Sequence, residues 1–191
     1  MKKVYLLALA LALALCGCGR REETEIHALQ QRWAAMEQLT MEAEITCHGA
    51  GESRSFTVVT TCTAEGATTT VTAPEELSGL SATVTGEELL LRYEGAALSA
   101  GVPPVLSPAA CVPYLVRSVA EGYLLEYGKE TLDGMDCLRA AFDTTAPDGG
   151  RILCTVWLER GTGVPCYGEF STNGAVVLTI RTLSFDMKEK E

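Results

Sequence analysis

Short segments in which apolar and polar residues alternate, separated by residues that favour turns, recur along most of this chain. The clearest segment is 41–48, where Met41, Ala43, Ile45 and Cys47 alternate with charged or polar residues. A period of two places the apolar side chains on one face of a β-strand. Turn residues arrive about every 8–12 positions, which is typical of an up-and-down antiparallel sheet.

The same reading places strands along the rest of the chain. The strongest hairpin signal is Asn173-Gly174, which lies between two apolar runs. The charged tail 187–191 is expected to be frayed. We expect strands at 40–48, 55–63, 68–73, 81–85, 88–93, 97–98, 123–131, 135–142, 152–159, 165–171 and 175–186.

One segment near the N-terminus has helical spacing instead. Within 25–39, Ile26, Leu29 and Trp33 recur at steps of three or four residues. This spacing predicts an amphipathic helix whose apolar stripe lies against the sheet, with Thr24 in position to cap its N-terminus.

A second helix is expected over 107–121. Ser107 is a favourable N-cap, and Pro108 suits the first helical position because its missing N–H costs little there. Gly122 is expected to end the helix. The inner face of this helix would consist of Leu106, Ala110, Tyr114, Leu115 and Val119.

The last strand, 175–186, is apolar on both faces. Val176, Leu178 and Ile180 interleave with Val177 and other apolar residues. A sheet that is covered on one side alternates more cleanly. Either the curvature of the sheet closes the second apolar surface, or that surface lines a cavity for an apolar ligand.

The N-terminus resembles the export signal of a lipoprotein. Two lysines precede an apolar run over 4–15, which is too short to span a bilayer because a spanning helix needs about 20 apolar residues. Its end, Leu15-Cys16-Gly17-Cys18, resembles the bacterial lipobox, in which a cysteine receives a diacylglyceryl group and cleavage follows just before it. Cys18 fits this role because the small Gly17 precedes it, whereas Cys16 follows a bulky leucine.

The lipobox resemblance implies a division of the chain. Residues 1–17 would be the signal peptide, 18–24 the lipidated cysteine and a polar tether, and 25–187 the folded body. The protein would then be lipid-anchored at the extracytoplasmic face of the cell membrane. The alternative is an ordinary cleaved signal with two incidental cysteines.

Charge limits the partners of the mature chain. Loss of Lys2 and Lys3 with the signal reduces the 15 basic residues to 13, against 25 acidic residues, for a net charge of −12. Phosphate backbones and anionic headgroups repel such a surface, so we expect no nucleic-acid partner. The acyl chains would supply the membrane affinity, at about 0.8 kcal/mol per buried methylene.

Six cysteines remain beyond Cys18. They contain no Cys-x-x-Cys motif, so neither a redox pair nor a zinc site is indicated. Two interpretations stay open: disulfides formed outside the cytoplasm, or buried thiols that stay reduced in an oxygen-poor habitat. The six are Cys47, Cys62, Cys111, Cys137, Cys154 and Cys166.

Three features carry a resemblance to a known family. A helix runs directly into the first strand at 39–45, a proline-containing step follows the third strand at 73–79, and a strand-turn-strand segment at 154–165 precedes the closing hairpin. In the order helix, meander, helix, meander, residues 25–186 resemble the LolA/LolB/LprG-type lipoproteins. The resemblance is one of architecture, with no diagnostic local motif.

The resemblance implies a mainly β (α+β) fold. This fold is a strongly curved antiparallel sheet, or half-barrel meander, with an N-terminal and a mid-chain helix packed on it. Several members of the family hold acyl chains between sheet and helices. Spore-forming bacteria also carry LolA-like lipoproteins that act in spore germination or envelope assembly as partners of other proteins. The resemblance therefore implies a non-enzymatic role in the cell envelope.

The residues give little support for an enzyme. His27 and His48 are the only histidines and form no His-Glu-x-x-His motif. Residues 98–101 lack the first glycine of a nucleophile elbow. The carboxylate pairs at 75–76 and 87–88 lie in expected turns, where a solvated role is favoured over acid–base chemistry. No catalytic residue, metal site or cofactor is predicted.

The ligand candidates are apolar residues expected to face the concave side of the sheet. Core packing is the alternative for each of them. We therefore carry two main hypotheses: a lipoprotein that binds or carries an apolar ligand such as a lipid or acyl chain, and an envelope or spore-germination protein with a filled core that binds a partner protein. A small enzyme is the third. The candidates are Phe56, Val58, Leu89, Leu91, Tyr93, Tyr114 and Trp157.

Overall fold

The computed structural model describes residues 18–49, 51–86, 88–102, 106–145 and 150–190, so the expected signal peptide at 1–17 lies outside it. The helices are α2 (Cys18–Ala34), the short 3₁₀ helix η1 (Glu75–Leu77) and α3 (Cys111–Glu121). The strands are β1 (Met36–His48), β2 (Ser53–Thr63), β3 (Gly66–Ala73), β4 (Ser81–Thr85), β5 (Glu88–Tyr93), β6 (Ala96–Ser99), β7 (Tyr123–Leu132), β8 (Met135–Thr145), β9 (Arg151–Glu159), β10 (Pro165–Thr172) and β11 (Ala175–Glu189).

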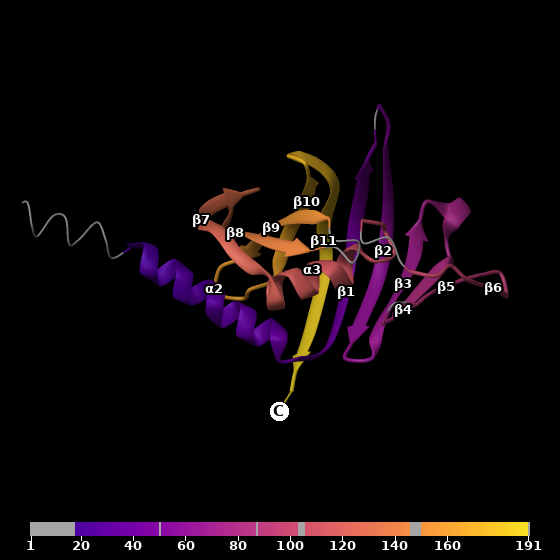
Figure 1. Cartoon of the computed structure of the whole chain (residues 1–191), viewed down its shortest axis with the longest axis horizontal. Helices are drawn as coiled ribbons and strands as arrows, with labels where there is room; N and C mark the ends of the chain where they lie inside the picture. Colours follow the sequence, from indigo (N-terminus) through magenta and orange to yellow (C-terminus); the bar gives the residue numbers. More distant parts are fainter. Residues whose placement is uncertain (1–17, 50, 87, 103–105, 146–149, 191) are drawn as a thin grey trace, which may run out of the picture.

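The strands form one antiparallel sheet with the order β6-β5-β4-β3-β2-β1-β11-β10-β9-β8-β7. The meanders β1–β6 and β7–β11 meet where the first and last strands pair at the centre (Figure 1). β6 and β7 are the two edges of the sheet. The segment between them contains α3, which lies across the sheet in Figure 1. The expected mainly β fold with two helices is confirmed.

Helix α2 differs from the expected helix over 25–39. It begins at Cys18 and ends at Ala34, so the segment expected to be a tether is helical. Strand β1 already begins at Met36, and Leu39 is buried in that strand opposite Cys62 of β2. Leu39 fits both the apolar stripe of a helix and the alternating pattern of a strand. The strand conformation is favoured because β1 pairs with two neighbouring strands.

Helix α3 and the C-terminal strand also differ from expectation at one end each. α3 begins at Cys111, because the carbonyl of Ser107 accepts hydrogen bonds from the N–H groups of Ala110 and Cys111 and forms a turn before the helix. β11 continues to Glu189, where the sequence predicted a frayed tail. The long β1 supplies a partner for these residues, and Met187 lies opposite Leu39.

The core lies between the helices and one face of the sheet, which we call the helix-covered face. Ala43, Ile45, Val58 and Val156 point from the central strands into this core and are fully buried. Full burial of a side chain of the size of valine or isoleucine contributes about 1.5–3 kcal/mol. We call the opposite face, which carries Trp157, the outer face.

The apolar residues of β11 differ in burial along the strand. Leu178 and Ile180 are buried in the core. Val176 and Leu183 are exposed, at 39% and 53%. Single exposed apolar side chains are normal on folded proteins and need no further explanation.

Candidate functional site

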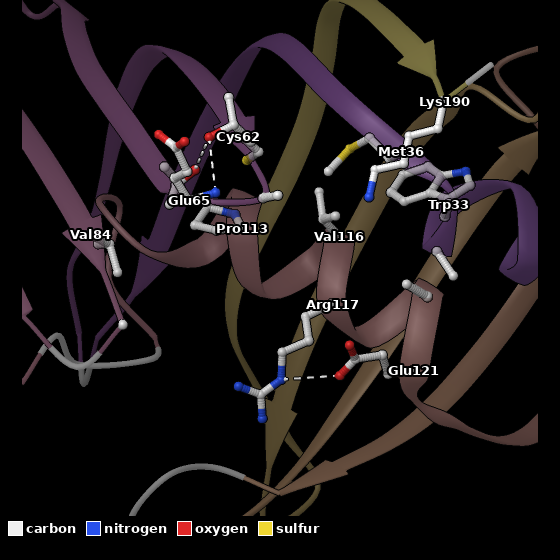
Figure 2. Close-up of a pocket in the computed structure, with 17 residues that line it drawn as sticks. Trp33, Met36, Cys62, Glu65, Val84, Pro113, Val116, Arg117, Glu121 and Lys190 are labelled. Atoms are coloured by element: carbon white, nitrogen blue, oxygen red, sulfur yellow. Dashed lines mark hydrogen bonds and ion pairs between the residues drawn. The ribbon is translucent and has the colours of Figure 1, made fainter.

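A groove of about 390 Å³ lies at one end of the helix-covered face, between α3, the end of α2 and the turn that joins β2 to β3 (Figure 2). Its volume is near the lower end of the range of small-molecule sites, which is roughly 300–1,000 Å³. The three segments are far apart in sequence and meet here because α2 ends where β1 begins. The main apolar lining residues are Trp33, Met36, Cys62, Ala67, Val84, Pro113, Val116 and Ala120.

Charged side chains of both signs stand around this groove. Arg117 and Glu121 form an ion pair at 3.9 Å on the exposed side of α3, and Glu65 lies on the turn opposite (Figure 2). Lys190 is held beside the groove because its backbone N–H donates to the carbonyl of Ala35 at 3.0 Å. The groove therefore offers an apolar wall with a mixed polar rim.

The Cys62 thiol in the groove wall is not suited to nucleophilic chemistry. Burial raises its pKa to about 12, so the side chain is a neutral thiol near pH 7. Thiolate, and not thiol, is the nucleophile and the metal ligand. Cys62 therefore acts as a small apolar side chain here.

α3 and the central strands contribute fully buried side chains to the core. Ile45 of β1, Val58 of β2 and Val119 of α3 are each 0% exposed and belong to one core cluster. Side chains without accessible surface leave no room for a ligand beside them. These three side chains are thus enclosed by protein atoms and line no space for a ligand.

The structure places the seven predicted ligand residues in different surroundings. Val58 and Tyr114 are buried in the core, and Phe56 packs against it and lines a separate pocket of about 420 Å³ near Cys47. Ligand binding by the seven stays a prediction. The other residues are placed as follows: Leu89 is buried, Leu91 is half-buried, Tyr93 is exposed and Trp157 is buried on the outer face.

Trp157, which the sequence placed with the ligand candidates, lies on the outer face of the sheet and outside the core cluster. Its ring contacts the Tyr167 ring at 5.5 Å between centroids, and the Arg139 guanidinium lies over it at 5.7 Å. Arg181 lies over the Tyr167 ring in turn, at 6.0 Å. These residues form a row across neighbouring strands on the outer face, opposite the core residue Val156. Arg–aromatic contacts of this kind stabilise a sheet surface by about 0.5–1 kcal/mol each.

All six cysteines expected in the mature chain are unpaired thiols in the structure. Burial raises the pKa of Cys154 to about 12 and raises the pKa of Cys111 further. Cys166 has its pKa raised to about 11, chiefly by burial and then by the neighbouring Cys137. Of the two interpretations left open by the sequence, this arrangement corresponds to reduced thiols that pack as small apolar groups.

The two histidines lie on the surface and apart from each other. His27 Nδ1 is 2.9 Å from Gln30 Oε1 on α2, and His48 bonds Ser53 and Thr179 at 3.3 Å each. Among the described residues no three His, Cys, Asp or Glu side chains gather into a group that could hold a metal ion. No helix in that part of the chain is long and apolar enough to span a membrane.

Comparison with known proteins identifies the fold. No protein-family model and no curated protein matches the chain. Among solved structures, an uncharacterised conserved protein from Thermus thermophilus is similar, with a TM-score of 0.53 and 9% identity, over 88% of this chain and 89% of that one. A LolA superfamily protein from Nitrosomonas europaea has a TM-score of 0.51 and 8% identity, over 87% and 95%. LprF from Mycobacterium bovis has a TM-score of 0.50 and 11% identity, over 87% and 93%.

These similarities extend over most of each chain, and their low identities limit the conclusion to the fold. The open, curved antiparallel sheet with two helices is LolA-like. The architecture expected from the sequence is confirmed.

Proposed function

We propose that this chain is a non-enzymatic lipoprotein of the bacterial envelope, anchored through Cys18 at the outer face of the cell membrane, which binds a partner protein. The observation that carries the proposal is the complete burial of core side chains on the helix-covered face, where Ile45, Val58 and Val119 have no accessible surface. If the interior holds no ligand, the LolA-like body can bind a partner only through its outer surfaces. Protein partners bind to such surfaces.

The position of Cys18 supports an anchor that holds the body close to the bilayer. Cys18 is the first residue of α2, and Glu22 already pairs with Lys129 of β7 at 2.8 Å. Four helical residues at about 1.5 Å each span only about 6 Å. The lipid would thus attach to the body through one turn of helix instead of a long flexible tether.

A fractionation experiment tests the anchor. In Cys18→Ser, diacylglyceryl transfer has no thiol to modify, so we expect the protein to leave the membrane fraction and to keep its uncleaved signal mass. Cys16→Ser is the matched control, because it changes a cysteine in the same segment and should remain anchored. Membrane retention of Cys18→Ser at the parental level, with parental processing, would refute the anchor.

A mass measurement tests the filled interior. The mature protein, extracted from bacterial membranes and analysed by native mass spectrometry, should carry its covalent lipid and no second lipid at stoichiometric occupancy. A co-purified lipid that fills the body would contradict the partner-binding function and favour a carrier function.

The groove in Figure 2 favours a second candidate function, the binding of an amphipathic small molecule. Its wall is apolar, and the Lys190 ammonium group stands at its rim, where it could attract a carboxylate. Val116→Trp would fill the groove, so it should abolish any such binding, whereas Lys190→Ala should weaken it. Retention of a bound amphiphile by Val116→Trp would show that the molecule lies elsewhere.

A further inference from the structure

The two edges of the sheet differ in how they are protected against pairing with another chain. A strand edge exposes unpaired N–H and C=O groups, and natural proteins block it with charges, proline or bulges. Edge strand β7 has such devices: Glu126, Lys129 and Glu130 lie on it, and its pairing with β8 contains a register shift between Leu124 and Glu126. In addition, the start of α2 is bound to β7 through the Glu22–Lys129 ion pair.

Edge strand β6 is less protected than β7: its pairing with β5 ends in an irregularity, where Leu89 bonds both Ala100 and Gly101, but the strand itself carries no charge or proline. Its sequence Ala-Ala-Leu-Ser contains neither charge nor proline, and all four residues are exposed. The Leu98 side chain is 63% exposed. An unprotected edge strand is a site where another strand can add to the sheet.

The β5–β6 hairpin determines which backbone groups are free. Glu94 and Gly95 both have positive φ, at 48° and 85°, as a two-residue type I′ turn requires, and Tyr93 pairs with Ala96 across it. Hydrogen-bonded and non-hydrogen-bonded positions alternate along an antiparallel pair. The backbone N–H and C=O groups of Ala97 and Ser99 therefore face the open edge.

Charge around this edge indicates the chemistry of the added strand. Glu75, Glu76, Glu88 and Glu94 are exposed on η1, on β5 and on the β5–β6 turn, against the single exposed cation Arg92 in this part of the described chain. A second copy of this chain would bring the same carboxylates to the interface and would be repelled, since the whole chain carries a net charge of −10. A basic segment is attracted instead.

The position of β6 would leave it accessible to a partner protein when the chain is anchored through Cys18. α2, which begins at Cys18, extends toward one end of the longest axis of the molecule, and β6 lies at the other end (Figure 1). A bilayer at Cys18 would thus leave the β6 edge accessible.

We propose that the β6 edge binds an extended, basic segment of the partner protein as an added antiparallel or parallel strand. This inference rests on the proposed partner-binding function and names where and by what chemistry that binding occurs.

The test uses the full mature protein in detergent and two synthetic ten-residue peptides, one alternating Lys with Val and one alternating Glu with Val. We expect the basic peptide to shift and protect the backbone amides of Ala97 and Ser99 in NMR spectra and in hydrogen exchange. The acidic peptide should bind at least tenfold more weakly. Equal binding of the two peptides, or amide changes confined to β7, would overturn the proposal.

A matched pair of variants isolates the backbone contribution. Ala97→Pro removes an N–H that faces the open edge and leaves the β5–β6 pairing intact, so it should lower the affinity for the basic peptide at least tenfold with little change in melting temperature. Ala97→Ser keeps the N–H and should bind like the parent. Parental affinity of Ala97→Pro would refute strand addition.

Two further outcomes separate this proposal from its alternatives. A concentration-dependent dimer that Ala97→Pro abolishes would show that a second copy occupies the edge, and would overturn the basic-partner assignment. A partner protein that binds the anchored parent and Ala97→Pro with equal affinity would refute the β6 edge as the binding site. The proposed partner-binding function would then still hold.

Discussion

Glu22 on the second turn of α2 and Lys129 on β7 form an ion pair with a distance of 2.8 Å, which joins the start of the chain's first described helix to an edge of the sheet. The hydrogen bond from Lys129 is the main reason why the pKa of Glu22 lies below its ordinary value. A polar segment that the sequence suggested was a tether is thereby part of the folded body.

The Glu22–Lys129 pair predicts a measurable dependence of stability on pH. A carboxyl whose pKa is lowered by folding contributes stability above its ordinary pKa, and this contribution is lost as the pH falls through the lowered value. We expect the parent to lose stability below about pH 4.5 more steeply than Glu22→Gln, which cannot titrate at this position. Denaturant unfolding at several pH values gives the free energy of unfolding of each protein. The same loss of stability at acid pH in both proteins would contradict the prediction.

The same ion pair predicts local order in α2. Lys129→Met removes the cation and keeps most of the side-chain volume, so amide hydrogen exchange should accelerate in the first turns of α2. Exchange in the β1–β11 pairing should stay unchanged, because that region shares no contact with Lys129. Faster exchange throughout the sheet would instead indicate global destabilisation.

Leu39 gives a test of the helix-to-strand boundary. The side chain is fully buried on β1, the strand that pairs with both β2 and β11, so Leu39→Ala should lower the free energy of unfolding by about 2–5 kcal/mol. Leu98→Ala removes the same atoms from an exposed position and should change stability by less than about 0.5 kcal/mol. Chemical denaturation gives both values, and similar losses in the two variants would place Leu39 outside the core.

Gly122 links α3 to β7 at a position where no Cβ fits. A Cβ there would approach the carbonyl oxygen of Ser118 and lie 2.9 Å from Phe142 Cβ, so Gly122→Ala should cost about 1–3 kcal/mol. At Gly128, also on the β7 side, a Cβ would meet no atom within 4 Å, and Gly128→Ala should be nearly neutral. Thermal unfolding compares the two, and equal melting temperatures would show that α3 shifts freely.

The thiols predict a clear labelling pattern. Because burial raises the pKa of Cys62 and Cys154 to about 12, these side chains should resist alkylation by iodoacetamide at pH 8 in the folded protein. In guanidinium without reductant, all six thiols of the mature chain should react. Mass spectrometry counts the adducts, and missing adducts in denaturant would reveal disulfides.

Much of the fold could be predicted because local pattern and global pairing agree. Strands β4 and β5 have the predicted bounds, since alternation and a turn containing Gly86 both specify that hairpin. The face of the sheet on which Trp157 lies could not be predicted, because residues 154–158 are all buried. A strand buried on both faces shows no alternation, so its sequence does not reveal which side chains face the core.

The groove was missed for a different reason. Its residues come from α2, α3, the β2–β3 turn and the end of β11, and no short sequence pattern unites them. Lys190 reaches it only because β11 continues beyond the expected end at residue 186. The helical stripe that contains Trp33 was the one available signal.

The pairing of β1 with β11 has a consequence for how the molecule is made. The centre of the sheet joins strands from opposite ends of the described chain, so it can form only after almost all residues have been delivered. Contacts this distant in sequence slow folding, because a long loop must close before they form. Until β11 is present, β1 would wait with one edge open, and factors that shield incomplete chains from pairing with others would act at this step.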